Sequence, residues 1–115
     1  MNRLVTLALL CLSGTFTVLA QNIPLSEYKT RRAALRKDLD GVVVLFGKGV
    51  GQDEVFGFVQ EPNFYYLTGW KWPGAVVLID KDDEVLFLPH HDKHMERYTG
   101  ARASAEDTDV KQVTG

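Results

Sequence analysis

One cluster of potential metal ligands stands out in the second half of the sequence. Its members are His90, His91, Asp92, His94 and Glu96. On a helix, His90 and His94 would share a face at i, i+4, as the two zinc ligands of a His-Glu-x-x-His motif do. The glutamate of that motif is missing here, and no third ligand is evident from a distant segment. A polar surface helix is therefore the favoured interpretation, and a metal site at His90 and His94 is the alternative.

Other catalytic arrangements are not found in the sequence. It has no Gly-x-Ser-x-Gly nucleophile elbow, and its one cysteine is Cys11, near the N-terminus. Gly47, Gly49 and Gly51 surround Lys48, but the spacing and the ending differ from those of a phosphate-binding P-loop. We interpret this segment as a flexible turn and expect no catalytic set in the mature chain.

The N-terminus has the features of a secretory signal peptide over residues 1–20. Arg3 provides the positive start, residues 4–12 form an apolar core, and Ala20 is the small residue at the cleavage site. Polar residues interrupt the apolar run before it reaches the length of a membrane span, so an N-terminal anchor is the less favoured alternative. We expect export to the periplasm or the medium, with no membrane contact of the mature domain, residues 21–115.

Composition limits what this domain can be. The chain has 115 residues, a formal net charge of −2 and one cysteine. Signal cleavage would remove that cysteine, so disulfides are not expected to support the mature domain. A domain of this size buries only about 60–65% of its surface, and we expect a partner domain or subunit to help. The near-neutral charge gives no reason to expect nucleic-acid binding.

The best helix candidate runs from Pro24 to Leu39. Ser26 is the expected N-cap, and apolar residues recur at helical spacing along one face. Arg32 lies in the middle of that face. Its aliphatic stem could cover the core while the charge reaches water, or the guanidinium could form a buried ion pair with a carboxylate. The basic residues of the opposite face, Arg36 among them, are expected to be solvated.

Three apolar runs predict strands, at residues 42–46, 75–79 and 85–88. The first two lack polar alternation, as strands covered on both faces do. A charged turn joins the second and third runs into a hairpin. About 28 residues separate the first two runs, which is enough for a crossover, so we predict a parallel pair and a mixed sheet. One or two helical turns are expected from Asp92 to Tyr98.

An aromatic stretch precedes the second of these strands. It runs from Asn63 to Gly69 and continues through Trp70 and Trp72. Because burial of each ring is worth about 1.5–3 kcal/mol, we predict a buried turn that leads into a central strand. One of the two indoles is a candidate for a cleft or an interface, where tryptophan is enriched. Core packing is the alternative for at least one of them.

Seven short segments, taken in order, cover most of the mature chain. The series consists of Arg31-Arg32-x-x-Leu35, Gly41-Val-Val-Val-Leu-Phe-Gly47, Asp53 with Phe58-x-Gln60, Asn63-Phe-Tyr-Tyr-Leu-Thr-Gly69, Pro73-x-Ala75-Val-Val-Leu78, Leu86-Phe-Leu-Pro89 and Asp92-x-x-x-Glu96-x-Tyr98-x-Gly100-x-Arg102. The series resembles the N-terminal domain of the Xaa-Pro aminopeptidase and prolidase family, the creatinase-like "pita-bread" metallopeptidases. Three positions depart from the usual residues of the family: Val59, Trp72 and Tyr98.

The resemblance implies an α/β layered domain with a mixed, partly parallel sheet flanked by helices, truncated at its C-terminus. Family members cleave the bond before proline with two metal ions, often manganese, which together activate a bridging water. The ligands belong to a separate C-terminal domain, and no position here matches them. We therefore expect no catalytic residue and no cofactor in this chain, with two manganese ions in the absent catalytic domain.

The implied role is assembly with the catalytic peptidase domain or with further subunits, as a homo-oligomer at full length. The domain would also border the substrate entrance, with Tyr65, Trp70 and Trp72 as candidates for that border. Two other classes of function remain open. One is a free-standing secreted binding or interaction module that uses the aromatic surface, and the other is a small metalloprotein built on the histidine cluster.

Overall fold

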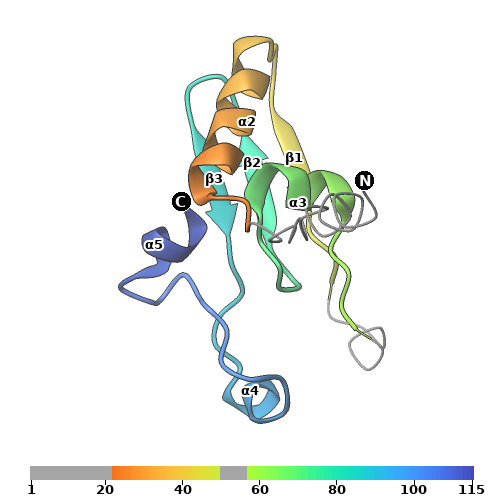
Figure 1. Ribbon diagram of the computed structural model, residues 1–115, viewed down its shortest axis with the longest axis vertical. Helices are drawn as coiled ribbons and strands as arrows, with labels where there is room; N and C mark the ends of the chain where they lie inside the picture. Colours follow the sequence, from red (N-terminus) through yellow and green to blue (C-terminus); the bar gives the residue numbers. More distant parts are fainter. Residues whose placement is uncertain (1–21, 50–56) are drawn as a thin grey trace, which may run out of the picture.

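The computed structural model describes residues 22–49 and 57–115. The expected signal peptide and the segment around Asp53 lie outside these ranges. Along the chain, the helices and strands are α2 (Leu25–Lys37), β1 (Val43–Phe46), α3 (Pro62–Thr68), β2 (Val76–Ile79), β3 (Glu84–Phe87), α4 (Lys93–Thr99) and α5 (Val110–Thr114). Helices α2 and α3 lie on one face of a single sheet, and α4 lies at the tip of an arm that extends beyond it (Figure 1). The expected α/β layered domain is confirmed.

The strands lie in the order β1-β2-β3, so β2 is central, as expected for the strand that follows the aromatic stretch. Both pairs are antiparallel. The hairpin prediction is confirmed, but the parallel pairing of the first two strands is wrong, and the described strands include no parallel pair. The reason is local: Gly47 donates to the Ala75 carbonyl (2.8 Å) and Gly74 donates to the Lys48 carbonyl (2.9 Å). These bonds continue the β1–β2 ladder past the end of β1 and before the start of β2. The residues between the two strands therefore form a long loop that returns the chain antiparallel to β1.

The aromatic stretch forms helix α3 rather than the predicted turn. The Glu61 carboxylate accepts the Phe64 N–H at 2.6 Å, which caps the helix and lowers the pKa of Glu61. Pro62 occupies the first turn, where its missing N–H is no loss. Gly69 ends the helix in the left-handed conformation, at φ 67°. The predicted burial is confirmed for Phe64, which is fully buried.

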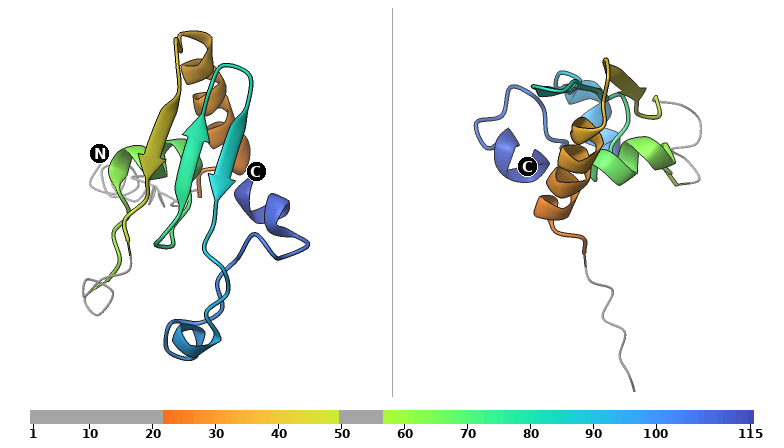
Figure 2. Two further views of the ribbon diagram at one scale, coloured as in Figure 1. Left: turned by 180° about the vertical axis from the view of Figure 1, so that it is seen from behind. Right: turned by 90° about the horizontal axis from the view of Figure 1, so that it is seen from above.

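The core lies between this helix layer and the inner face of the sheet. Val77 and Ile79 of β2 point into it and contact the side chains of α3. Every second residue of each strand points the other way, and no described helix lies over that outer face (Figure 2). Within residues 22–49 and 57–115, no helix combines the length and the apolar character that a bilayer crossing requires.

Arg32 is the one charged residue that is buried among residues 22–49 and 57–115. Its side chain is 8% exposed; Nη1 donates to the Leu67 carbonyl (3.0 Å) and Nη2 to the Glu84 carboxylate (3.1 Å). Of the two interpretations of this arginine, the buried ion pair is therefore the correct one. Arg36, expected to be solvated, donates to the Asp80 carbonyl (3.1 Å). These contacts join α2 to the end of α3 and to the β2–β3 hairpin.

The N-terminus of α2 differs from the prediction. The helix begins at Leu25, Pro24 is the N-cap, and no side chain caps it. Ser26 lies inside the first turn, where its carbonyl accepts the Thr30 hydroxyl at 3.0 Å. The fixed φ of proline suits a helix start, so the helix begins before the serine that could have capped it.

Substitution of Arg32 should be costly. We expect Arg32→Met to lower the free energy of unfolding by about 2–4 kcal/mol, because it leaves the Leu67 carbonyl and the Glu84 carboxylate without their donor. Urea denaturation of the chain measures the loss. Lys29→Met, on the exposed side of the same helix, is the matched control and should change stability by less than about 0.5 kcal/mol.

A second substitution tests the mechanism of that loss. Glu84→Leu in the Arg32→Met background should recover part of the stability, because it removes a carboxylate that has lost its hydrogen-bond donor and keeps only the longer contact to Arg36, at 3.9 Å. Equal losses in the Arg32→Met and Lys29→Met variants would contradict the assigned role of Arg32.

Candidate functional site

The structure separates the three aromatic candidates for a border or interface. Trp70 is 3% exposed and belongs to the core, and its Nε1 has no hydrogen-bond acceptor among the described residues. Trp72 is 37% exposed, with its ring centre 4.7 Å from that of Trp70. Tyr65 is half-buried, and its hydroxyl lies 3.5 Å from that of Tyr28. Trp72 and Tyr65 thus present surface, whereas Trp70 supports Trp72 from below.

Burial of Tyr28 and its contact with Tyr65 raise the pKa of Tyr28 to about 12. The Tyr28 phenol therefore acts as a neutral hydrogen-bonding group over the physiological pH range. Gly69 makes this arrangement possible, because a β-carbon at that position would overlap the Tyr28 ring. The close approach of α2 to the end of α3 thus requires glycine here.

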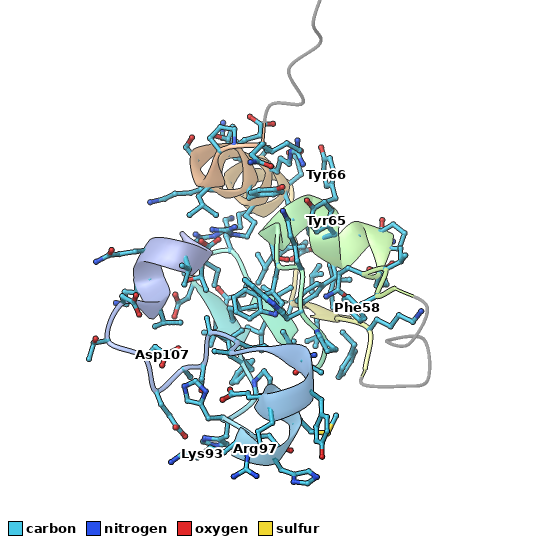
Figure 3. All side chains as sticks on the ribbon, turned by 60° about the horizontal axis from the view of Figure 1, so that its bottom comes forward. Phe58, Tyr65, Tyr66, Lys93, Arg97 and Asp107 are labelled. Carbon is cyan, nitrogen blue, oxygen red and sulfur yellow. The ribbon has the colours of Figure 1, made fainter. Side chains whose placement is uncertain are left out.

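Sequence reasoning missed Tyr66, which lies beside Tyr65 on α3 (Figure 3). The Arg31 guanidinium lies 4.3 Å from the centre of the Tyr66 ring and donates to the Tyr66 carbonyl at 3.1 Å. This cation–aromatic contact forms a surface at the junction of α2 and α3. The pairing could not be read from the sequence, because the two residues are 35 positions apart.

Gln60 was also assigned no role from the sequence. Its Oε1 accepts the Lys48 N–H at 2.6 Å, and its Nε2 donates to the Trp72 carbonyl at 2.9 Å. One amide therefore holds the chain after β1 against the chain that carries Trp72. The sequence signal that could have indicated this role is the position of Gln60, a polar residue directly before the N-cap of α3.

The three histidines of the second half contact different partners. Of the cluster, Asp92 is the N-cap of α4, and its carboxylate accepts hydrogen bonds from the N–H groups of His94 and Met95. The helix begins after His90, so the i, i+4 relation of His90 and His94 is not realised on it. His90 contacts Glu106, and the His94 ring packs edge-on against Tyr98 at 5.7 Å. The helix predicted from Asp92 to Tyr98 is confirmed.

His91 bridges two carboxylates. Its Nδ1 lies 2.7 Å from Glu96 of α4, and its Nε2 lies 2.9 Å from Asp107. These hydrogen bonds raise the pKa of His91 to about 9, and the bond to His91 lowers the pKa of Asp107. The charged imidazole thus links the arm that carries α4 to the turn at residues 104–107.

Across the described parts of the chain, no three His, Cys, Asp or Glu side chains are arranged to hold a metal ion. Glu96 and Asp107 are engaged by His91, Glu106 by His90, and Asp92 by the N-terminus of α4. The donor set here does not fit a two-metal peptidase centre, and the alternative of a site at His90 and His94 stays a prediction.

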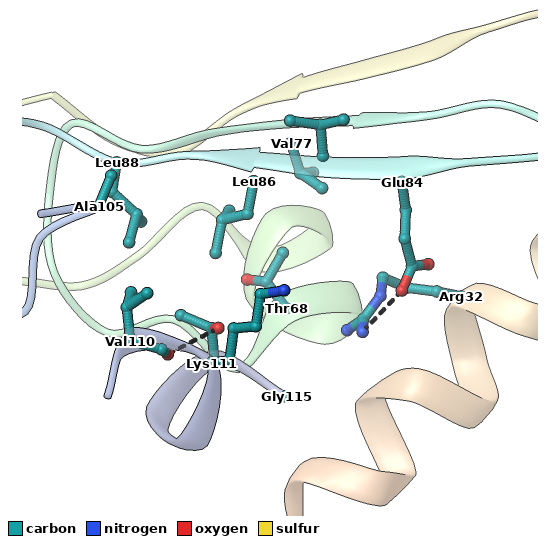
Figure 4. Close-up of a pocket in the computed structure, with 12 residues that line it drawn as sticks. Arg32, Thr68, Val77, Glu84, Leu86, Leu88, Ala105, Val110, Lys111 and Gly115 are labelled. Atoms are coloured by element: carbon teal, nitrogen blue, oxygen red, sulfur yellow. Dashed lines mark hydrogen bonds and ion pairs between the residues drawn. The ribbon is translucent and has the colours of Figure 1, made fainter. Parts of the chain in front are cut away.

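A cleft of about 390 Å³ lies between the sheet, α2, α3 and α5 (Figure 4). Its walls are mostly apolar and include Val77, Leu86 and Val110. At one end are Arg32 and Glu84, but these charges satisfy each other. The cleft is therefore suited mainly to an apolar group, with Lys111 as a further charged residue in its wall. A smaller cleft of about 260 Å³ lies at the base of the arm, beside His91.

Comparison with solved structures shows in which class of protein this fold occurs. The chain matches Pseudomonas aeruginosa aminopeptidase PepP with a TM-score of 0.66 and 26% identity, over 81% of this chain and 23% of that one. It matches Escherichia coli aminopeptidase P, zinc-substituted and with product, with a TM-score of 0.67 and 26% identity, over 83% and 24% of the two chains. The fold is thus one found within aminopeptidases.

Sequence comparison is more specific. The family described as "Aminopeptidase P, N-terminal domain" matches residues 28–114, and the chain belongs to this family. A relative in Dictyostelium discoideum, Xaa-Pro aminopeptidase 3, is 33% identical over 84% of this chain. Intermediate cleaving peptidase 55 of Schizosaccharomyces pombe is 35% identical over 76% of it. The chain spans about a fifth of the length of these relatives, 20% in both cases.

The Gln60 bridge predicts a loss of stability when its amide is removed. Gln60→Met keeps the volume but removes the hydrogen bonds from the amide to the Lys48 N–H and the Trp72 carbonyl, both of which lie at the surface, so we expect a loss of about 0.5–1.5 kcal/mol. Thermal unfolding and tryptophan fluorescence check this prediction. Gln112→Met, at an exposed glutamine of α5, is the matched control. An unchanged melting temperature together with unchanged tryptophan emission in Gln60→Met would contradict it.

The His91 bridge predicts a specific pH dependence. Because its pKa is higher in the folded chain, about 9, than in an unfolded one, about 6.5, the stabilisation is complete below about pH 6.5. It should disappear as the pH rises through about 9. Melting temperatures between pH 6 and 10, with the His91 ring signals followed by NMR, test this. His91→Gln should remove the dependence and His94→Gln should retain it; a His91 signal that titrates near pH 6.5 would refute the bridge.

Proposed function

We propose that this chain is the noncatalytic N-terminal domain of an exported Xaa-Pro aminopeptidase, an enzyme that releases the residue before a proline. The observation that carries the proposal is the family match over residues 28–114, which covers nearly all of the described chain. The solved relatives support it, because the same fold occupies less than a quarter of an aminopeptidase P. In this proposal the remaining polypeptide performs the chemistry.

Manganese dependence belongs to the same proposal. A pair of metal ions would polarise the scissile carbonyl and lower the pKa of the attacking water, within the catalytic domain. The residues described here offer no such donor set. Their proposed contribution is to assemble with the catalytic domain and to shape the approach of the substrate.

For the substrate entrance we propose Trp72 and Tyr65 rather than Trp70. Trp72 is partly exposed and held by Gln60, and Tyr65 is half-buried beside Tyr28. Trp70 is buried and would act only by supporting Trp72. In the longer enzyme, Trp72→Ala should raise KM more than it lowers kcat, because the ring is proposed to bind substrate without touching the reacting atoms.

Two measurements test the central proposal. The reading frame beyond Gly115 should continue and encode the aspartate, glutamate and histidine ligands of a dinuclear site. The protein from that frame, supplied with manganese, should release the first residue of an Xaa-Pro peptide and leave a matched Xaa-Ala peptide intact. The 115-residue chain alone should release nothing above the blank.

The contrary outcomes are equally defined. Release of amino acids by the 115-residue chain alone would overturn the noncatalytic role. A reading frame that ends at Gly115, with a chain that unfolds cooperatively on its own, would favour the free-standing binding module. Retention of the mature protein in the cytoplasm, with residues 1–20 still attached, would overturn the proposed export.

A further inference from the structure

The cleft between the sheet, α2, α3 and α5 has the size of a small-molecule site. Its volume of about 390 Å³ falls within the roughly 300–1,000 Å³ that is usual for ligand pockets. The end away from Arg32 is apolar and is formed by Leu88, Ala105 and Val110 (Figure 4). Because removal of apolar surface from water is favourable, this end of the cleft favours an aliphatic occupant.

The polar side chains of the lining are engaged within the chain, with one exception. Arg32 and Glu84 bind each other at 3.1 Å. The hydroxyls of Thr68 and Thr114 each donate to a backbone carbonyl of their own helix, at 2.7 and 2.9 Å. The exception is Lys111, whose ammonium group has no partner among the residues that the structure describes. The lining therefore offers a single charge to a ligand, and that charge is positive.

Lys111 is placed to use this charge inside the cleft. Its side chain extends from α5 toward the sheet, between the charged end and the apolar end (Figure 4). The whole chain has a formal net charge of −2, so a preference for anions at this place is local rather than general. One cation beside an apolar end is complementary to a ligand that has one negative group and an aliphatic body.

We propose that this cleft binds an aliphatic carboxylate of medium chain length. The carboxylate pairs with Lys111, and the hydrocarbon chain lies along Leu86, Leu88 and Val110. A group the size of a water molecule takes up about 30 Å³, so the cleft holds about thirteen such groups, and a carboxylate of about eight to ten carbon atoms fits within it. The inference does not depend on the proposed function, because it involves no peptidase step.

A peptide suits the same cleft less well. Every residue of a peptide brings an N–H group and a C=O group, and burial of a backbone group without a partner is costly. The lining hydroxyls that would donate to such a carbonyl, those of Thr68 and Thr114, already donate within their own helices. An aliphatic chain brings no such groups. The lining therefore favours a fatty acid over the end of a polypeptide.

The test is an NMR titration of the full 115-residue chain with three probes, each kept below its micelle concentration. We expect octanoate to bind with a Kd of about 0.1–1 mM and to shift the signals of Leu86, Val110 and Lys111. Hexanoate is shorter by two methylene groups and should bind about tenfold more weakly. Octylammonium has the tail of octanoate with the opposite charge, and it should bind about fivefold more weakly or worse.

Variants separate the role of the charge from that of the volume. Lys111→Met keeps an aliphatic stem without the ammonium group, so it should weaken octanoate binding about fivefold. Ala105→Phe fills the apolar end without a change of charge and should abolish binding. Lys29→Met, on the exposed side of α2, removes a charge away from the cleft and should retain the Kd of the unchanged chain. If Ala105→Phe does not fold, Lys111→Met and the three probes decide.

The opposite results are also defined. Equal affinity for octanoate and octylammonium, or an unchanged Kd in Lys111→Met, would overturn the assigned role of the charge. Octanoate shifts that leave the signals of Leu86 and Val110 unchanged would place the ligand elsewhere. Tighter binding of N-acetyl-leucyl-leucine than of octanoate would assign the cleft to the end of a polypeptide. Absence of octanoate binding to a longer protein that contains this chain would show that the following polypeptide fills the cleft, and would overturn the inference as well.

Discussion

The buried guanidinium of Arg32 is the constraint on which the other contacts of the domain depend. A charge removed from water has to be paired and hydrogen-bonded, and here both partners lie far away in the sequence: the last turn of α3 and the start of β3. Satisfying this one group therefore brings α2, α3 and the hairpin to a common point. Once α3 is held there, Tyr65 and Tyr66 lie against α2, and the chain leaves the helix toward Trp70. The position of the aromatic surface thus follows from an electrostatic requirement.

Two backbone features then direct the chain from α3 into the central strand. Gly69 ends the helix in a left-handed conformation and approaches the Tyr28 ring too closely for any side chain. Gln60 binds the carbonyl of Trp72 and so fixes the segment that follows. As a result, Trp70 lies in the core and Trp72 lies at the surface. A candidate interface is therefore built from residues whose own role is to pack and to hydrogen-bond.

Sequence patterns were sufficient for the local elements and for the family, but not for pairings between distant residues. The hairpin, the first helix and the short helix after Asp92 follow from periodicity and turn residues, which act over a few positions. The direction of β1 against β2 does not, because a connection of that length permits either one. Arg32 had two acceptable environments until Glu84, 52 positions away, was placed. In the same way, the histidine spacing suggested a shared helical face, but α4 begins after His90 and His91 pairs with Asp107, 16 positions away.

The bridge at His91 connects the two segments of the arm, one leading to α4 and one returning from it. The chain leaves the sheet after β3, passes through α4 and comes back, and the imidazole closes this excursion into a ring by binding Glu96 on the outgoing side and Asp107 on the returning one. Asp107 in turn accepts the N–H of Val110, the first residue of α5. These contacts thus form a continuous chain from α4 through His91 and Asp107 to the start of α5. Without the imidazole, the outgoing and returning segments of the arm would lose this link to each other.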